Sequence, residues 1–243
     1  MTYLGILMSY FRISESEYLT NYLHFEKESI MNDKHQVHNL IILDESGSMD
    51  SIKEHIISGF NEIVQTIKGI QTEYPEQEHF ISMITFNGFG QKLLHFADPV
   101  SKLEQIDSAR YKPAASTPLY DAIGAAIGKM KLVVANQEKY NVLVTILTDG
   151  EENASVEFTG RAVRNLIDKL KEENWTFTYI GTDHDVQRVA NFISINNVIS
   201  FGKNAVGLRT MFEGEKAARH NFSKNIRENK DTKNDYFDYA NKG

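Results

Sequence analysis

Apolar and polar positions follow one another in blocks along this 243-residue chain, and the blocks predict strands and helices in turn. Residues 39–43 form a short run rich in strand-forming residues without polar alternation, and residues 141–147 form a second one. Such runs are typical of strands that are buried on both faces of a parallel sheet. Between them, residues 52–67 place their isoleucine, valine and phenylalanine side chains on one helical face. That spacing predicts a helix packed on the sheet.

Further blocks continue this alternation. Asn87 and Gly88 supply the chemistry of a hairpin turn, so the strand after them is expected to be antiparallel and to lie at an edge. The order of elements predicts an α/β fold, a doubly wound, mostly parallel six-stranded open sheet with one antiparallel edge strand and helices on both faces. The other predicted strands are residues 80–86, 91–96, 176–180 and 198–201, and the other predicted core helices are 119–134, 161–171 and 186–192.

Residues 1–36 are predicted to be an N-terminal extension. Their apolar stretch, residues 1–11, is shorter than the roughly 20 residues of a membrane-spanning helix. It also lacks the basic start and the cleavage site of a signal peptide. Either the extension packs as an extra arm, or the natural start is Met8 or Met31 and the upstream residues are a start-site artefact. We favour the second interpretation.

The core domain is predicted to span residues 37–206. Residues 207–243 follow it, with a mainly polar closing helix at 214–229 and a charged, frayed tail from residue 230 onward. The hydrophobic content of 41% is enough for one α/β domain with a sizeable core.

Composition excludes several function classes. The formal net charge of −7 argues against a nucleic-acid partner, because binding a phosphate backbone requires a clustered basic surface. The chain has no cysteine, which excludes disulfides, thiolate zinc sites and cysteine nucleophiles, and is compatible with a reducing compartment. We therefore expect a cytoplasmic protein that does not engage a membrane. His35 and His38 are expected on opposite faces of a strand, so they do not form a zinc pair.

The first predicted strand ends abruptly in oxygen-bearing side chains. Asp44, Ser46 and Ser48 are two residues apart, so their side chains can converge on one point in a loop, and Gly47 permits a tight turn there. One carboxylate and two hydroxyls are hard donors that suit a small, hard cation such as Mg²⁺. On its own this pattern has an alternative interpretation, in which Asp44 ends the strand and a serine caps the next helix.

Two more stretches strengthen the metal interpretation. The second buried strand also ends in an aspartate, Asp149, followed by a glycine. The helix before that strand opens with Thr117 and Pro118, which fit the N-cap and the first helical position. In open parallel sheets, ligands bind beyond the carboxyl ends of the strands, where the strand order reverses. The residues predicted to converge on one cation are Asp44, Ser46, Ser48, Thr117 and Asp149.

These residues resemble those of the von Willebrand factor A-type domains. The metal-ion-dependent adhesion site of that family is written Asp-x-Ser-x-Ser, then a distant Thr, then a distant Asp, and all five positions match here in type and order. The resemblance covers residues 37–201. It is nearest to stand-alone bacterial members, because residues 172–181 resemble the segment leading into their fifth strand. For Thr117 alone, a plain helix cap stays an alternative.

The resemblance implies a Mg²⁺ or Mn²⁺ site in which the three hydroxyls bind the metal while Asp44 and Asp149 act directly or through water. It also implies a protein partner that contributes an Asp or Glu to the metal. The expected function is therefore that of a non-enzymatic, metal-dependent protein-binding module. No particular oligomeric state follows from the residues.

The alternative function is a Mg²⁺-dependent phosphoryl-transfer or hydrolase domain. It would use Asp44 as nucleophile or metal ligand and Lys203, just past the last strand, as phosphate partner. Such enzymes usually place a second carboxylate near the first, where this chain has serines. Glu45, Glu151 and Glu152 are expected to be a solvated rim around the site rather than general bases.

Overall fold

The computed structural model describes residues 34–182 and 185–238. Nearly all of them belong to one compact unit, Gln36–Gly243. The predictions for residues 1–33, including the choice of start site, lie outside the described residues. The same holds for the last five residues of the predicted tail.

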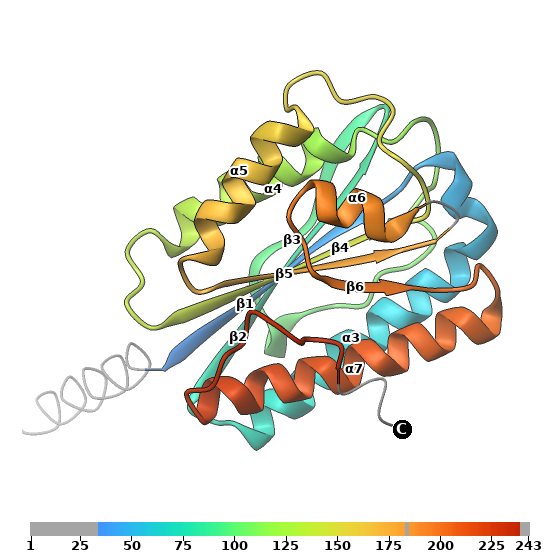
Figure 1. Cartoon of the computed structure of the whole chain (residues 1–243). Coiled ribbons are helices and arrows are strands. Elements are labelled where there is room, and N and C mark those ends of the chain that lie inside the picture. Colours follow the sequence, from blue (N-terminus) through green and yellow to red (C-terminus); the bar gives the residue numbers. More distant parts are fainter. Residues whose placement is uncertain (1–33, 183–184, 239–243) are drawn as a thin grey trace, which may run out of the picture. The chain divides into compact units, whose positions relative to one another are not determined.

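One six-stranded sheet forms the centre of this unit, in the order β3-β2-β1-β4-β5-β6 (Figure 1). Neighbouring strands pair in parallel from β1 to β6 by way of β4 and β5, whereas β2 and β3 form an antiparallel hairpin that leaves β3 at the edge. This confirms the predicted sheet. The strands are β1 (His35–Asp44), β2 (Gln77–Asn87), β3 (Gly90–Pro99), β4 (Tyr140–Thr148), β5 (Trp175–Gly181) and β6 (Asn197–Ser200).

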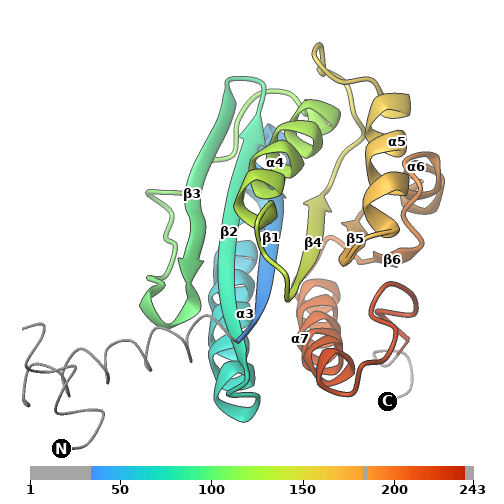
Figure 2. The ribbon, with the colours of Figure 1, turned by 90° about the vertical axis from the view of Figure 1, so that its left-hand side faces the viewer.

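Helices cover both faces of the sheet, as predicted. Helices α3 and α7 lie together on one face, and α4, α5 and α6 lie on the other (Figures 1 and 2). Among the described helices, none is long and apolar enough to cross a bilayer. The α-helices are α3 (Lys53–Glu73), α4 (Leu119–Val134), α5 (Gly160–Lys171), α6 (Val186–Phe192) and α7 (Ala205–Arg227), with short 3-10 helices at η1 (Gly47–Ile52) and η2 (Val100–Lys102).

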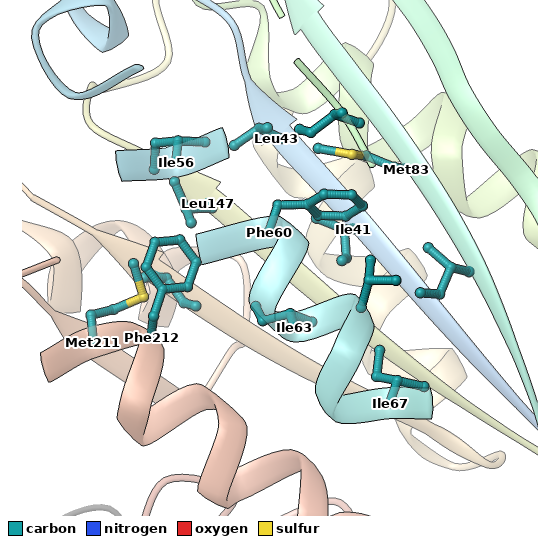
Figure 3. Packing of buried hydrophobic residues seen from close by; sticks show 14 of the residues in the cluster. Ile41, Leu43, Ile56, Phe60, Ile63, Ile67, Met83, Leu147, Met211 and Phe212 are labelled. Carbon is teal, nitrogen blue, oxygen red and sulfur yellow. The ribbon is translucent and has the colours of Figure 1, made fainter. Parts of the chain in front are cut away.

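The two faces have separate hydrophobic cores because successive strand residues point to opposite sides. In β1, Ile41 and Leu43 contribute to the core under α3 and α7, whereas Leu40 and Ile42 contribute to the core under α4 and α5. Figure 3 shows the first core, in which Phe60 of α3 lies beside Ile41 of the sheet. The continuous apolar runs of the sequence are thus explained by burial on both faces.

Helix α7 begins earlier than predicted. The sequence pattern placed the closing helix at residues 214–229, but the helix spans Ala205–Arg227. Asn204 caps it, since its side-chain oxygen accepts a hydrogen bond from the Gly207 backbone N at 2.9 Å. Gly207 weakens the helical pattern in the sequence, yet it allows the first turn to pack against Gly202. A Cβ added at Gly207 would lie 2.3 Å from the Gly202 carbonyl oxygen.

The predicted frayed tail is also wrong for residues 230–238. The Thr232 carbonyl accepts a hydrogen bond from Thr176 Oγ1 of β5 at 3.0 Å, and the Asn197 side-chain amide donates to the Lys233 carbonyl at 2.8 Å. Tyr236 is buried beside α7. The charged residues of this segment concealed the aromatic anchor, so the charge pattern alone was misleading.

Candidate metal-binding site

The site lies at the carboxyl ends of β1 and β4, which are adjacent and parallel. Leu43 pairs with Leu147, so the residues that follow them emerge at the same edge of the sheet. The loop after β1 is tied to its surroundings by the Gly47 backbone N, which donates to the Ala115 carbonyl at 3.0 Å. The predicted neighbourhood of Asp44 and the loop after β4 is therefore confirmed.

Asp44 is fully buried, and both of its carboxylate oxygens accept hydrogen bonds. The Ser46 backbone N donates to Oδ1 at 2.7 Å, and Thr148 Oγ1 donates to Oδ2 at 2.6 Å. Burial raises the pKa of Asp44 to about 6, although these hydrogen bonds act in the opposite direction. The carboxylate is thus held in one orientation by neutral donors.

A chain of hydrogen bonds joins three other candidate residues. Ser46 Oγ and Ser48 Oγ are 3.2 Å apart, and Ser48 Oγ donates to Asp149 Oδ1 at 2.6 Å. The Asp149 side chain is fully buried, and Lys203 Nζ lies 2.6 Å from its Oδ2. That contact is an ion pair rather than a well-aligned hydrogen bond. Ser46 takes the backbone N-cap position of η1, but its side chain makes no cap hydrogen bond, so the capping interpretation is not supported.

Thr117 lies at the same edge but does not cap α4. The N-cap residue is Pro118, one position later than predicted, and its own side chain makes no cap hydrogen bond. Glu152 Oε2 accepts from the Tyr120 backbone N in the first turn at 3.0 Å. Asn153 holds Thr117 instead, since its side-chain oxygen accepts from the Thr117 backbone N at 2.9 Å. A Cβ added at Gly150 would lie 3.7 Å from Thr117 Oγ1 and 4.0 Å from Ser48 Oγ. Both hydroxyls therefore face the loop that carries Asp149.

The chemistry of these side chains fits a small, hard cation. Two carboxylates and three hydroxyls provide oxygen donors only, which is the preference of Mg²⁺. The buried Asp149 carboxylate already has a cation beside it, the Lys203 ammonium. Within the described ranges, no three His, Cys, Asp or Glu side chains are grouped as metal ligands. A site that takes most of its oxygens from hydroxyls does not depend on such a group.

The prediction that Glu45, Glu151 and Glu152 form a solvated rim around the site is wrong for two of the three residues. Glu45 is buried, accepts a hydrogen bond from Thr85 Oγ1 at 2.7 Å and pairs with Lys92 Nζ at 2.8 Å. A buried carboxylate needs such partners, and here they fix the loop that follows Asp44. Glu152 is half-buried and accepts hydrogen bonds from the backbone of its own loop. Of the three glutamates, Glu151 alone is exposed as expected.

Sequence reasoning missed two residues that position Asp44. Thr148 hydrogen-bonds its carboxylate, and the hydroxyl of the buried Tyr111 donates to the Asp44 carbonyl at 2.7 Å. For Thr148 a signal existed: the parallel register places the last residue of β4 opposite Asp44. Tyr111 gave no local signal, because its contact depends on the path of the loop before α4.

Comparison with known proteins identifies the fold family. The model of the von Willebrand factor type A domain matches residues 40–226, more than half of the chain. Among the curated proteins compared, none is significantly similar in sequence.

Several solved structures share the fold at low sequence identity. The PilB minor pilin from Streptococcus sanguinis is 11% identical, with a TM-score of 0.57 over 77% of this chain and 62% of the pilin. The pilus adhesin SpaC from Lactobacillus rhamnosus GG is 13% identical, with a TM-score of 0.53 over 81% of this chain and 31% of SpaC. The vWF domain of the pili tip protein Mfa5 from Porphyromonas gingivalis is 12% identical, with a TM-score of 0.51 over 82% of this chain and 97% of that domain. The chain thus spans less than two thirds of PilB and of SpaC.

Proposed function

The chain belongs to the von Willebrand factor type A family, and from this membership we infer a non-enzymatic protein-binding module that holds its partner through Mg²⁺ or Mn²⁺ at the edge site. Domains of this family generally mediate protein–protein interactions. The observation that carries the proposal is the hydrogen-bonded chain from Ser46 through Ser48 to Asp149, with Asp44 beside it at the ends of two adjacent strands.

The hydroxyl and carboxylate side chains have different roles in this proposal. The hydroxyls of Ser46, Ser48 and Thr117 supply oxygen without negative charge, whereas Asp44 and Asp149 supply the charge that attracts a cation. When bound, a divalent ion would provide an electrophilic centre for one carboxylate oxygen of the partner. The partner is therefore proposed to present an Asp or Glu at the point of contact.

The geometry does not favour the alternative phosphoryl-transfer function. A nucleophilic aspartate must offer one oxygen to its substrate. Both oxygens of Asp44 accept hydrogen bonds, and the side chain is fully buried. Lys203, the suggested phosphate partner, pairs with Asp149 instead. We propose a binding function without catalysis for these reasons.

The compartment and the type of protein stay predictions. The absence of cysteine is the basis for expecting a cytoplasmic protein, and the resemblance of residues 172–181 to the segment leading into the fifth strand is the basis for expecting a stand-alone bacterial module. Structural similarity to pilus proteins at 11–13% identity concerns the fold and does not place this chain outside the cell.

Calorimetry tests the metal site directly. Mg²⁺ or Mn²⁺ added to the chelator-treated full chain should bind once per molecule, and Ser46→Ala should weaken binding by about tenfold or more, the effect of losing roughly 1.4 kcal/mol. Ser51→Ala is the matched control, because Ser51 Oγ of the same loop donates to the Ser48 carbonyl at 3.3 Å and is not a proposed ligand. Equal affinities for wild type and Ser46→Ala would show that the site is misassigned.

A pull-down completes the test of function. The immobilised chain should retain a protein partner in Mg²⁺ and release it in chelator, and Thr117→Val should retain less. The partner's interaction should then depend on one Asp or Glu. A partner held equally well in chelator would leave the metal, if it binds, a structural role only.

A further inference from the structure

The turn between β6 and α7 brings a lysine of the chain itself to the proposed metal site. Lys203 Nζ lies 2.6 Å from Asp149 Oδ2, and the lysine side chain is 21% exposed whereas the aspartate is fully buried. β6 is two strands away from β4 in the sheet, so this side chain extends past the end of β5. An ammonium thus sits against a carboxylate that we assign to the metal.

The backbone on both sides of Lys203 is firmly placed. The Phe201 backbone N donates to the Gly181 carbonyl at 3.1 Å, which extends the β5–β6 pairing to the start of the turn. After the turn, Asn204 caps α7, and Gly202 lies directly against Gly207 of the first helical turn. Lys203 is therefore held between a strand end and a helix cap, which fixes the point from which its side chain extends.

The two cations would compete for the same carboxylate. Asp44 and Asp149 carry two negative charges at the edge, and Lys203 supplies one positive charge in contact with Asp149. A divalent ion beside Asp149 would be repelled by the ammonium at this short distance, and burial strengthens the repulsion because the local dielectric constant is lower than in water. The ion pairs Lys92–Glu45, Arg188–Glu151 and Arg188–Asp185 at this edge use carboxylates that are not assigned to the metal.

We propose that Lys203 is a tethered counter-ion of the metal site. It pairs with Asp149 when no divalent ion is bound and must move away when one binds, so it lowers the affinity of the site for Mg²⁺ and Mn²⁺. This proposal rests on the proposed function, since it assumes that Asp149 is a metal ligand. It makes Lys203 the residue that sets the metal concentration at which the module becomes competent to bind its partner.

Calorimetric titration of the full chain with Mg²⁺ and with Mn²⁺, at one fixed pH, tests the proposal. Lys203→Met keeps the length of the side chain but removes its charge, and it should bind the metal about tenfold more tightly or better, a difference of roughly 1.4 kcal/mol. Lys203→Gln is a second neutral variant in case the first folds poorly, and it should behave in the same way. Lys203→Arg keeps the charge and should stay near the wild-type affinity.

Arg188→Met is the matched control. It removes one positive charge from the same edge of the sheet, but Arg188 pairs with the exposed Glu151 and not with a proposed ligand. Its metal affinity should stay within about threefold of wild type, because exposed charges are strongly screened. A rise in affinity equal to that of Lys203→Met would show a general charge effect and overturn the proposal.

The outcomes separate this proposal from the proposed function. Wild type and Lys203→Met binding the metal equally would overturn the role of Lys203 and leave the metal site intact. Binding by Lys203→Met alone would support the competition and overturn metal dependence in the natural chain. Binding by neither Lys203→Met nor Lys203→Gln, with both variants folded, would overturn both proposals.

Discussion

Two clusters of buried polar side chains lie against β1 and β4, and they differ in how their charges are balanced. We call the first the edge cluster, at the strand ends, with two buried aspartates and one lysine. The second, the interior cluster, lies on the face of the sheet covered by α7. Its members are Asn39, Thr145, Glu215, Arg219 and Tyr236.

The interior cluster is built around one buried ion pair, Arg219 with Glu215. The two terminal nitrogens of Arg219 bind Asn39 Oδ1 at 2.7 Å, Thr145 Oγ1 at 2.8 Å and Glu215 Oε1 at 2.7 Å. One positive and one negative charge cancel, and both side chains are shielded from solvent. The edge cluster has two carboxylates for one ammonium. A buried cluster with balanced charges can support the fold by itself, whereas the surplus negative charge of the edge cluster favours the binding of a cation.

The largest effect on stability is expected from breaking the buried ion pair between Arg219 and Glu215 of the interior cluster. Arg219→Met leaves Glu215 buried without its cation and should lower the free energy of unfolding by about 3–5 kcal/mol. The double variant Arg219→Met with Glu215→Gln removes both charges and should recover a large part of that loss. Urea unfolding of wild type, the two single variants and the double variant measures the coupling between Arg219 and Glu215. If the free energy of unfolding of Arg219→Met lay within about 1 kcal/mol of the wild-type value, the structural role of the cluster would be contradicted.

Acid should also lower the stability of the fold, through the buried side chain of His38. This side chain is buried in β1, with its ring stacked on Phe80 at a centroid distance of 5.0 Å, and burial lowers its pKa to about 4. Unfolded histidine titrates near pH 6.5, so the unfolded chain gains the proton first, and stability is lost as the pH falls from about 6.5 towards 4.

Going from about pH 7.5 to about pH 5, this one group should lower the free energy of unfolding by about 2 kcal/mol. Urea unfolding of wild type and His38→Phe at the two pH values, both in chelator, isolates the effect. The variant cannot gain that proton, so its loss over the same range should be smaller by about this amount. Equal losses in the two proteins would assign the acid sensitivity to other groups.

The fold could be predicted almost completely because burial on both faces leaves continuous apolar runs, as in residues 39–43 and 141–147. The two strands are expected to be neighbours because both end in candidate metal ligands, and the structure pairs them in parallel. The start of α7 could not be predicted as well. Gly207 weakens the helical pattern there, and only the packing of that glycine against Gly202 explains its presence.

The candidate site was predictable to the extent that it depends on strand ends. Asp44 and the loop of Asp149 meet because β1 and β4 are parallel neighbours, which the sequence pattern already favours. The sequence predicts that Glu45 is exposed, because the local pattern does not indicate its contacts with Thr85 and Lys92 of the β2–β3 hairpin. The sequence pattern indicates Lys203 only as a possible phosphate partner. Its contact with Asp149 depends on a turn whose direction the sequence pattern does not define.

The smallest effect on stability is expected from breaking the exposed ion pair between Arg188 and Glu151. Arg188 and Glu151 approach to 2.9 Å, nearly as close as Arg219 and Glu215, but their side chains are 63% and 53% exposed. Water and salt screen such a pair, and holding two long side chains in place costs conformational entropy, so Arg188→Met should change the free energy of unfolding by less than about 1 kcal/mol. Urea unfolding at low and high salt measures it, and the small effect should shrink further as salt is added. A loss comparable to that of Arg219→Met would mean that proximity rather than burial decides what an arginine–glutamate pair contributes to stability here.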